Sequence, residues 1–441
     1  MRRFGRIPAT AAPAVAAAAG TADVPDAAFA AIAKAGGPAS AAAALRRAAD
    51  RIERRTPAHR DRAVDGLRAL ALLAVPTGHW MLGGFTLDPE GGLHNASPLS
   101  ALPVLAPASW VLQMLGIFFL VGGYASVLSY RRREGSTGAW LRGRVARLGR
   151  PVLGVTAVWA LAAPLLYAAG VPEATLRTAA TLVIQPLWFV GVYLVVTALT
   201  PYCVRAARRL GGWAAAPLLA SVAAVDFLRY GPFAGSVPSW LAVLNILPGW
   251  LFAYQLGVSW GERRIGRRGA WLLLAGGGVL FAVLLAVFHY PASMVGVPGA
   301  ERTNSHPPSL LVLALAAAQS GAAMLLRERL ARLLAQPALW APVVVVNLCA
   351  MTILCWHQTA MLAAAVPGSF AGGVAGLTTA PDSPAWIAAR LLWLPLFAVL
   401  LAGIARYARR FEEPWTGATA VRRTAAGLLA AGYGVFALGL A

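Results

Sequence analysis

The chain is poor in charged residues: Asp, Glu, Lys and Arg make up 12% of its 441 residues, whereas 59% are hydrophobic. A soluble globular domain carries about 25% charged residues, so the composition excludes an ordinary soluble protein. Cysteine is also scarce, and the spacing of Cys203, Cys349 and Cys355 indicates neither a disulfide framework nor a metal site. The sequence also has no phosphate-binding loop, nucleophile elbow or metal-ligand signature, so we predict no metal cofactor.

The positive charge does not indicate a nucleic-acid partner. The formal net charge is +21, and all but one of the 38 basic residues are arginines. These arginines form short clusters between apolar segments, which is the pattern of cytosolic loops in membrane proteins rather than of a nucleic-acid binding surface.

Long apolar runs recur along most of the chain, as in a polytopic membrane protein. We therefore predict an all-α membrane helical bundle with ten core transmembrane helices and a possible eleventh at the C-terminus. The expected ten lie at residues 63–85, 107–130, 150–170, 181–204, 212–228, 239–260, 270–290, 308–326, 340–366 and 385–408, and the eleventh candidate at 424–441.

Arginine alternates between the loops of this prediction. Loops after even-numbered segments hold 22 arginines and loops after odd-numbered segments hold four. By the positive-inside rule, this asymmetry predicts a multi-pass protein of the plasma (inner) membrane with its N-terminus in the cytosol. The four arginines assigned to loops after odd-numbered segments are Arg177, Arg229, Arg302 and Arg390.

Three regions are expected along the chain. Residues 1–60 are rich in Ala and Pro and become Arg-rich, which indicates a disordered cytosolic tail or an amphipathic helix over 41–55 on the inner leaflet. Residues 61–415 form the transmembrane domain. Residues 416–441 form a C-terminal segment with the possible extra span.

The first segment carries three ionisable residues, Asp65, Arg68 and His79. Such groups cost several kcal/mol inside a bilayer unless they face a protein interior or a wet cavity, so they indicate function. On a helix, His79 returns to within about 20° of Arg68 and lies about 16 Å further along the axis. Asp65 lies about 40° around the helix from His79. Imidazole suits proton transfer near neutral pH, which makes His79 the leading catalytic candidate, with Arg68 and Asp65 beside it. A buried structural histidine is the alternative.

Arg144, Arg147 and Arg150 recur at three-residue spacing just before the third segment. If this stretch is helical, Arg144 and Arg147 share a face, and Arg150 lies next to them, further around the helix. Grouped guanidinium groups suit a polyphosphate at the cytosolic surface, although an ordinary topology signal would look the same.

Further candidates are weaker. His357, within Cys355-Trp356-His357-Gln358 of the ninth segment, lies at a depth similar to His79, so the two could line one cavity; a satisfied core histidine is the alternative. Trp188 and Tyr193 suit packing or interface anchoring. The polar residues of two outer loops could contact an acceptor, but solvated loop positions are the simpler interpretation; these residues are Asp88, Glu90, His94, His289, Glu301 and His306.

Several motifs together resemble the acyltransferase-3 family of membrane-bound O-acyltransferases, in family order over about residues 61–415. Two motifs depart from the family pattern: Gly122 stands where serine is usual, and Ile353 and Cys355 replace the usual polar or aromatic residues. The matching stretches are Asp65-Gly-Leu-Arg68 with the Arg-x10-His spacing to His79, Gly116 to Tyr124, Arg144 to Pro151, Leu187-Trp188-Phe189, Ile353 to Gln358, and Phe411-Glu-Glu-Pro414.

The resemblance implies a ten-helix core with both ends cytosolic. It also implies acyl transfer from cytosolic acyl-CoA, with acetyl-CoA the expected donor, to an outer hydroxyl of a glycan, lipid-linked saccharide or glycosylated natural product. His79 would be a general base or a transient acyl carrier. Arg68 and the three arginines before the third segment would hold the donor phosphates.

The main alternative is a transporter or lipid flippase with a proton relay through Asp65 and His79. The hydropathy pattern shows no inverted halves or paired broken helices, which many transporters have. A non-catalytic relative is disfavoured because Arg68 and His79 are both present. The sequence leaves open the acceptor, the acyl chain length and the oligomeric state.

Overall fold

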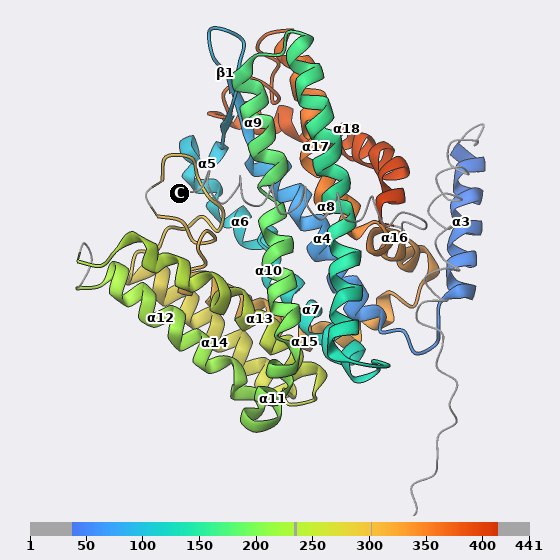
Figure 1. The fold of residues 1–441 in the computed structure, drawn as a ribbon, viewed down its shortest axis with the longest axis vertical. Helices are drawn as coiled ribbons and strands as arrows, with labels where there is room; N and C mark the ends of the chain where they lie inside the picture. The colour runs from blue at the N-terminus through green and yellow to red at the C-terminus, as the bar shows by residue number, and fades with distance from the viewer. Residues whose placement is uncertain (1–37, 233–235, 301, 413–441) are drawn as a thin grey trace, which may run out of the picture. The chain divides into compact units, whose positions relative to one another are not determined.

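The computed structural model describes residues 38–232, 236–300 and 302–412, coloured in Figure 1. It divides into two compact units: unit 1 is Met1–Ala69 with Arg327–Leu348, and unit 2 is Leu70–Leu326 with Cys349–Ala441. The predicted tail up to residue 37 and the candidate span 424–441 lie outside the described residues.

The described chain is almost entirely helical, as predicted. Eight of its helical stretches are long and apolar enough to cross a membrane, or up to nine if the broken pair α16 and α17 is one span. The helix α4, which covers the first predicted segment, is not among the eight. The predicted count of ten transmembrane helices is therefore not confirmed. The helices of at least ten residues are α3 (Pro38–Arg55), α4 (Arg62–Leu82), α7 (Leu115–Arg131), α8 (Thr137–Ala168), α9 (Glu173–Ile184), α10 (Leu187–Ala198), α11 (Thr200–Leu210), α12 (Ala216–Tyr230), α13 (Ile246–Gly261), α14 (Arg267–Ala286), α15 (Leu310–Leu333), α16 (Pro337–Leu348), α17 (Ala350–Ser369) and α18 (Pro384–Ala408).

Two features differ from the sequence prediction. The helix α8, which covers the third predicted segment, begins at Thr137 rather than near residue 150. The Ser136 side chain accepts the Ala139 N–H and caps its first turn. A short antiparallel hairpin, β1 (Gly84–Leu87) and β2 (Leu93–Ala96), follows α4. The hairpin lies where a solvated loop was expected, and His94 of β2 is exposed, with its Nε2 2.8 Å from Asp88 Oδ2.

In unit 1, α3 covers the stretch where an amphipathic helix was expected and packs on α16. Ile52, Leu334 and Trp340 form the small core of this unit. The Trp340 indole donates its N–H to the Thr56 hydroxyl over 2.8 Å, so the buried ring satisfies its polar atom.

In unit 2, α7 and α13 cross with their backbones in contact (Figure 1). A Cβ added at Gly257 would run into the Leu120 carbonyl oxygen, and one at Gly123 into the Tyr254 carbonyl oxygen. Small residues at helix crossings let membrane helices approach closely, where packing rather than hydrophobic burial drives association. These two glycines therefore set the distance between α7 and α13.

Replacing Gly257 with alanine should lower the stability of the protein by about 3 kcal/mol, because the clashing atoms are backbone and cannot turn aside. Thermal unfolding of the protein in lipid nanodiscs measures this. Gly276→Ala on α14 is the matched control, since a Cβ there meets nothing within 4 Å and should cause no loss. Equal melting temperatures for wild type and Gly257→Ala would contradict the expectation.

Aromatic rings from α7, α10 and α13 fill the space beside this crossing. Phe119 stacks on Trp250 with ring centroids 5.2 Å apart and contacts Phe189 at the same distance. A Cβ at Gly122 would lie 2.7 Å from Cε2 of Tyr193. Tyr193 thus fills the space that the serine usual at this position would need, which gives the departure at Gly122 a physical reason.

Candidate active site

His79 lies near the end of α4, three residues after Pro76, and is half-buried. A proline inside a helix removes one backbone hydrogen bond and loosens the turn around it. The helix ends at Leu82, three residues after His79, and the Gly83 N–H donates to the His79 carbonyl over 3.1 Å at this end. The imidazole is therefore presented where its helix ends.

The helix α17 holds this end of α4. Gln358 Nε2 lies 3.1 Å from His79 Nδ1, across a sequence separation of 279 residues. The Trp80 indole donates its N–H to the His357 carbonyl over 3.0 Å. Two adjacent residues of α4 thus meet two adjacent residues of α17, which fixes the orientation of the His79 ring.

The Gln358 amide can select the tautomer of His79. An amide side chain presents either its NH₂ or, after rotation by 180°, its carbonyl oxygen. With the carbonyl facing Nδ1, the proton stays on Nδ1 and Nε2 is left as a base. The opposite orientation keeps Nδ1 unprotonated, so the amide controls which nitrogen is available for chemistry.

His357 is fully buried, and its ring centroid is 5.1 Å from that of His79. Its Nδ1 lies 2.9 Å from the Leu354 carbonyl oxygen, so Nδ1 carries the proton and Nε2 is an acceptor. This Nε2 has no hydrogen-bond partner within the residues that the structure describes. Buried polar atoms are rarely left unpaired, so His357 is not the fully satisfied core histidine that the sequence left as the alternative.

The start of α17 is held by the closing motif of the chain. The Glu412 carboxylate accepts the Thr352 backbone N–H over 2.7 Å and also the Thr352 hydroxyl. An anion at the first turn of a helix is stabilised by the free N–H groups there. Phe411 packs against Gly154 of α8, where an added Cβ would lie 2.7 Å from the ring. This motif therefore positions the helix that carries His357 and Gln358.

Arg390 is a buried cation that the sequence analysis counted among the loop arginines; the structure corrects this, because it lies inside α18 with no exposed surface. Its guanidinium donates to the Trp80 carbonyl over 2.6 Å, to the Gly83 carbonyl over 2.7 Å and to the Gly376 carbonyl over 3.0 Å. Arg390 thus caps the end of α4, next to His79. A charge within a predicted apolar segment was the signal that could have identified it.

The three arginines predicted to bind the donor all lie on α8. Arg144 and Arg150 are half-buried and Arg147 is exposed. The Arg144 guanidinium lies 5.2 Å from the centre of the Trp140 ring. The helical spacing that the sequence analysis assumed is therefore present, and phosphate binding by these residues stays a prediction.

Asp65 and Arg68, the other predicted catalytic residues, belong to unit 1. Arg60 forms an ion pair with the Asp65 carboxylate, and Asn347 donates to the Asp65 carbonyl over 2.9 Å. Arg68 is half-buried and forms no ion pair among the described residues. Their catalytic role stays a prediction.

Trp188, on α10, is half-buried and contacts two aromatic rings from other elements. Its ring centroid is 5.8 Å from that of Trp250 and 4.8 Å from that of His306, which meets it nearly edge-on. The sequence analysis treated His306 as a solvated loop residue. No motif marks it, and its contact with Trp188 arises only from tertiary packing.

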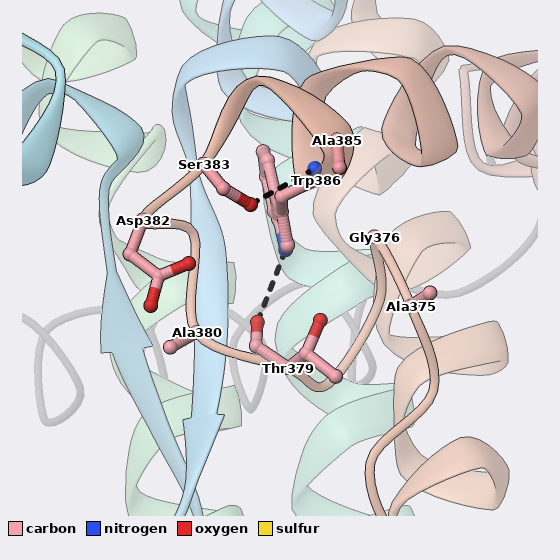
Figure 2. Close-up of a pocket in the computed structure, with 8 residues that line it drawn as sticks. All are labelled: Ala375, Gly376, Thr379, Ala380, Asp382, Ser383, Ala385 and Trp386. Atoms are coloured by element: carbon pink, nitrogen blue, oxygen red, sulfur yellow. Dashed lines mark hydrogen bonds between the residues drawn. The ribbon is translucent and has the colours of Figure 1, made fainter.

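A separate pocket of about 280 Å³ lies between the end of α17 and the start of α18. Figure 2 shows Trp386 in its wall, with the indole N–H donated to the Thr379 carbonyl over 3.0 Å. Asp382 is the one ionisable residue that lines it. Its lining includes neither His79 nor His357, so the pocket is distinct from the histidine pair.

The site contains no cluster typical of a metal centre: within the described ranges, no three His, Cys, Asp or Glu side chains are grouped to hold an ion. The family model described as an acyltransferase domain, acyltransferase-3, matches residues 61–405. No curated protein and no solved structure gives a significant match. The family match spans all the motifs up to α18 and includes His79, Gln358 and Arg390. The chain therefore belongs to the acyltransferase-3 family and is a multi-pass membrane acyltransferase.

Proposed function

We propose that the protein transfers an acyl group, with acetyl as the expected one, from cytosolic acyl-CoA to a hydroxyl of a glycan, lipid-linked saccharide or glycosylated natural product on the outer side of the plasma membrane. The observation that carries this proposal is the His79 imidazole at the end of α4, held at Nδ1 by Gln358 beside the buried His357. An oriented imidazole within a membrane domain is suited to moving a proton away from bulk water.

In the direct route, His79 accepts the proton of the acceptor hydroxyl while the hydroxyl oxygen attacks the thioester carbonyl carbon. The carbon–sulfur bond breaks, and the thiolate leaves with the proton from His79. The products are an ester and free CoA. In the alternative route, an imidazole nitrogen attacks the thioester carbonyl carbon, the carbon–sulfur bond breaks, and CoA leaves as a thiol with the proton of the imidazole. The acceptor oxygen then attacks the acyl-imidazole, the carbon–nitrogen bond breaks, and the hydroxyl proton passes to the imidazole.

The donor would approach from the arginine-rich ends of the helices, which we place in the cytosol together with the N-terminus. Arg144, Arg147 and Arg150 on α8 would bind the CoA phosphates, together with Arg68 of α4. Guanidinium groups suit this role because they bind phosphate through paired hydrogen bonds. The pantetheine arm would then extend along the helices toward His79.

Acyl transfer by purified protein in lipid nanodiscs tests the proposal. The assay follows release of free CoA from acyl-CoA donors of increasing chain length, with and without glycoside acceptors, and identifies the ester by mass spectrometry. We expect CoA release that depends on the acceptor. A protein that releases no CoA with any donor and acceptor, yet moves a solute across liposomes, would favour the transporter alternative.

Replacing Arg147 with alanine should raise the KM for acyl-CoA about 10-fold and leave kcat nearly unchanged, because one charge-assisted phosphate contact contributes about 1.5–3 kcal/mol. Initial rates against acyl-CoA concentration measure this. Arg142→Ala is the matched control, since Arg142 is also exposed on α8 but lies about 160° around the helix from Arg144. Equal KM changes in both variants would contradict a specific phosphate site.

A further inference from the structure

The loop at residues 287–309, between α14 and α15, is held rigidly at the residues around His306. Asn304 and Ser305 are buried. The Asn304 amide donates to the Ser293 carbonyl over 2.8 Å and accepts from the Ser309 hydroxyl over 2.7 Å. Buried polar side chains with several partners order the backbone around them. His306 therefore projects from an ordered support rather than from a loose loop.

The other part of this loop is tied down by Asp226 of α12. This buried carboxylate accepts the Tyr290 hydroxyl over 3.0 Å and the Leu310 backbone N–H over 2.8 Å. The Arg302 guanidinium lies 4.0 Å from the centre of the Tyr290 ring. Contacts from α12 thus fix both the beginning of the loop and its junction with α15.

The same loop reaches the end of α4 that carries His79. Gly78 is in contact with Leu112 of α6 (Ala106–Leu112), since a Cβ on it would lie 3.6 Å from the Leu112 Cβ. The next residue, Gln113, donates to the Ser305 hydroxyl over 2.8 Å. His79 and His306 are therefore each adjacent in sequence to one end of a chain of contacts that runs from Gly78 through Leu112 and Gln113 to Ser305.

His306 is both exposed and surrounded by protein. More than a third of its surface is accessible, yet burial lowers its pKa below the usual value of histidine. The two observations agree if the ring lines a concave opening, with Trp188 on one side. The lowered pKa keeps the ring neutral at pH 7, and a neutral imidazole both donates and accepts a hydrogen bond.

We propose that His306 binds the acceptor substrate, by hydrogen bonding a hydroxyl next to the one that is acylated at His79, with the Trp188 ring as the apolar wall of the subsite. The acceptor class that fits a hydrogen-bonding imidazole beside an aromatic ring is a pyranose, which has several hydroxyls and an apolar ring face. This inference rests on the proposed function, since it assumes acyl transfer at His79.

The test compares octyl glycopyranosides of several sugars with 1-octanol as acceptors of acetyl groups from acetyl-CoA, using the full chain in nanodiscs. We expect wild type to prefer at least one glycoside to octanol. His306→Ala should raise the KM for that glycoside about 10-fold or more, since a lost hydrogen bond in a partly desolvated site costs about that much. The KM for acetyl-CoA and the rate with octanol should change less than about twofold.

Two controls keep the readout specific. His289→Ala removes the other histidine of the same loop, which is also exposed, and should leave all three parameters unchanged. His306→Gln keeps a hydrogen-bonding side chain and should recover part of the glycoside affinity, which a purely structural role would not predict.

The possible failures are distinguishable. Wild type that releases no CoA with any acceptor overturns the proposed function. Wild type that acylates glycosides, together with His306→Ala that has an unchanged KM for them, overturns the assignment of His306 alone. Preference of wild type for octanol over every glycoside overturns the pyranose class.

Discussion

Replacing His79 with alanine is expected to abolish acyl transfer while the protein still inserts in the membrane and folds. The His79 imidazole takes the acceptor proton in the proposed reaction, and loss of a general base lowers kcat by about 10²–10⁴-fold. CoA release under saturating donor and acceptor measures the loss, and thermal unfolding in nanodiscs verifies that the fold is kept.

The matched control is His94→Ala in β2, because His94 is exposed and pairs with Asp88 of the same hairpin. This variant should keep wild-type activity. If His79→Ala retained more than about a tenth of the wild-type kcat, the assignment of His79 as the reacting group would be wrong.

The variant His79→Ala also helps to distinguish the general-base route from the acyl-carrier route. If His79 carries the acyl group, wild type quenched early in turnover should show an acyl adduct on the His79 peptide by mass spectrometry, and His79→Ala should show none. If His79 is only a base, neither protein should show the adduct although wild type is active. Detection of the adduct therefore identifies the acyl-carrier route, because a general base forms no covalent bond to the acyl group.

Replacing Arg390 with methionine is expected to lower both stability and kcat. Methionine fills a similar volume but donates no hydrogen bonds, so the carbonyls of Trp80, Gly83 and Gly376 would be left buried and unpaired. Each unpaired buried carbonyl costs about 1–3 kcal/mol. We therefore expect a loss of about 3 kcal/mol or more in the free energy of unfolding, seen as a lower melting temperature.

A positioning role for Arg390 predicts more than instability. Measured at a temperature where the variant is folded, kcat should fall about 10-fold while the KM for acyl-CoA stays unchanged, because the end of α4 next to His79 loses its cap. Arg390→Lys, which restores the charge and some of the donors, should recover part of both losses. Arg177→Met on α9 is the control, since Arg177 is exposed and only pairs with Glu173. A folded Arg390→Met protein with wild-type kcat would show that the contact is structural only.

Much of the helical architecture could be predicted because a bilayer leaves the backbone few options. With no water to bond free N–H and C=O groups, an apolar run of about 20 residues must form a helix. The hydropathy pattern therefore located a helix in each of the ten expected segments, although the start of α8 was missed because the Ser136 cap extends the helix beyond its apolar part. The hairpin β1–β2 was also missed, since two strands of four residues leave little periodic signal.

Residues of the candidate site were predicted only where a single apolar segment contains an unusual titratable residue. His79 and His357 were recognisable as titratable groups inside apolar helices. Gln358 was seen as part of a motif but not as the partner of His79 Nδ1. For His306, a solvated loop position was preferred to contact with an acceptor. Contacts between residues hundreds of positions apart have no signal in a single sequence, because packing rather than local spacing creates them.

By itself, the sequence determined that this chain is a helical membrane protein and that its first long apolar segment contains an imidazole, because bilayer solvation constrains composition and position so strongly. Tertiary structure alone decided which groups surround that imidazole. Gln358 meets Nδ1 and Arg390 caps the end of α4, and elsewhere Trp188 contacts His306, since these choices depend on how segments distant in sequence pack side by side.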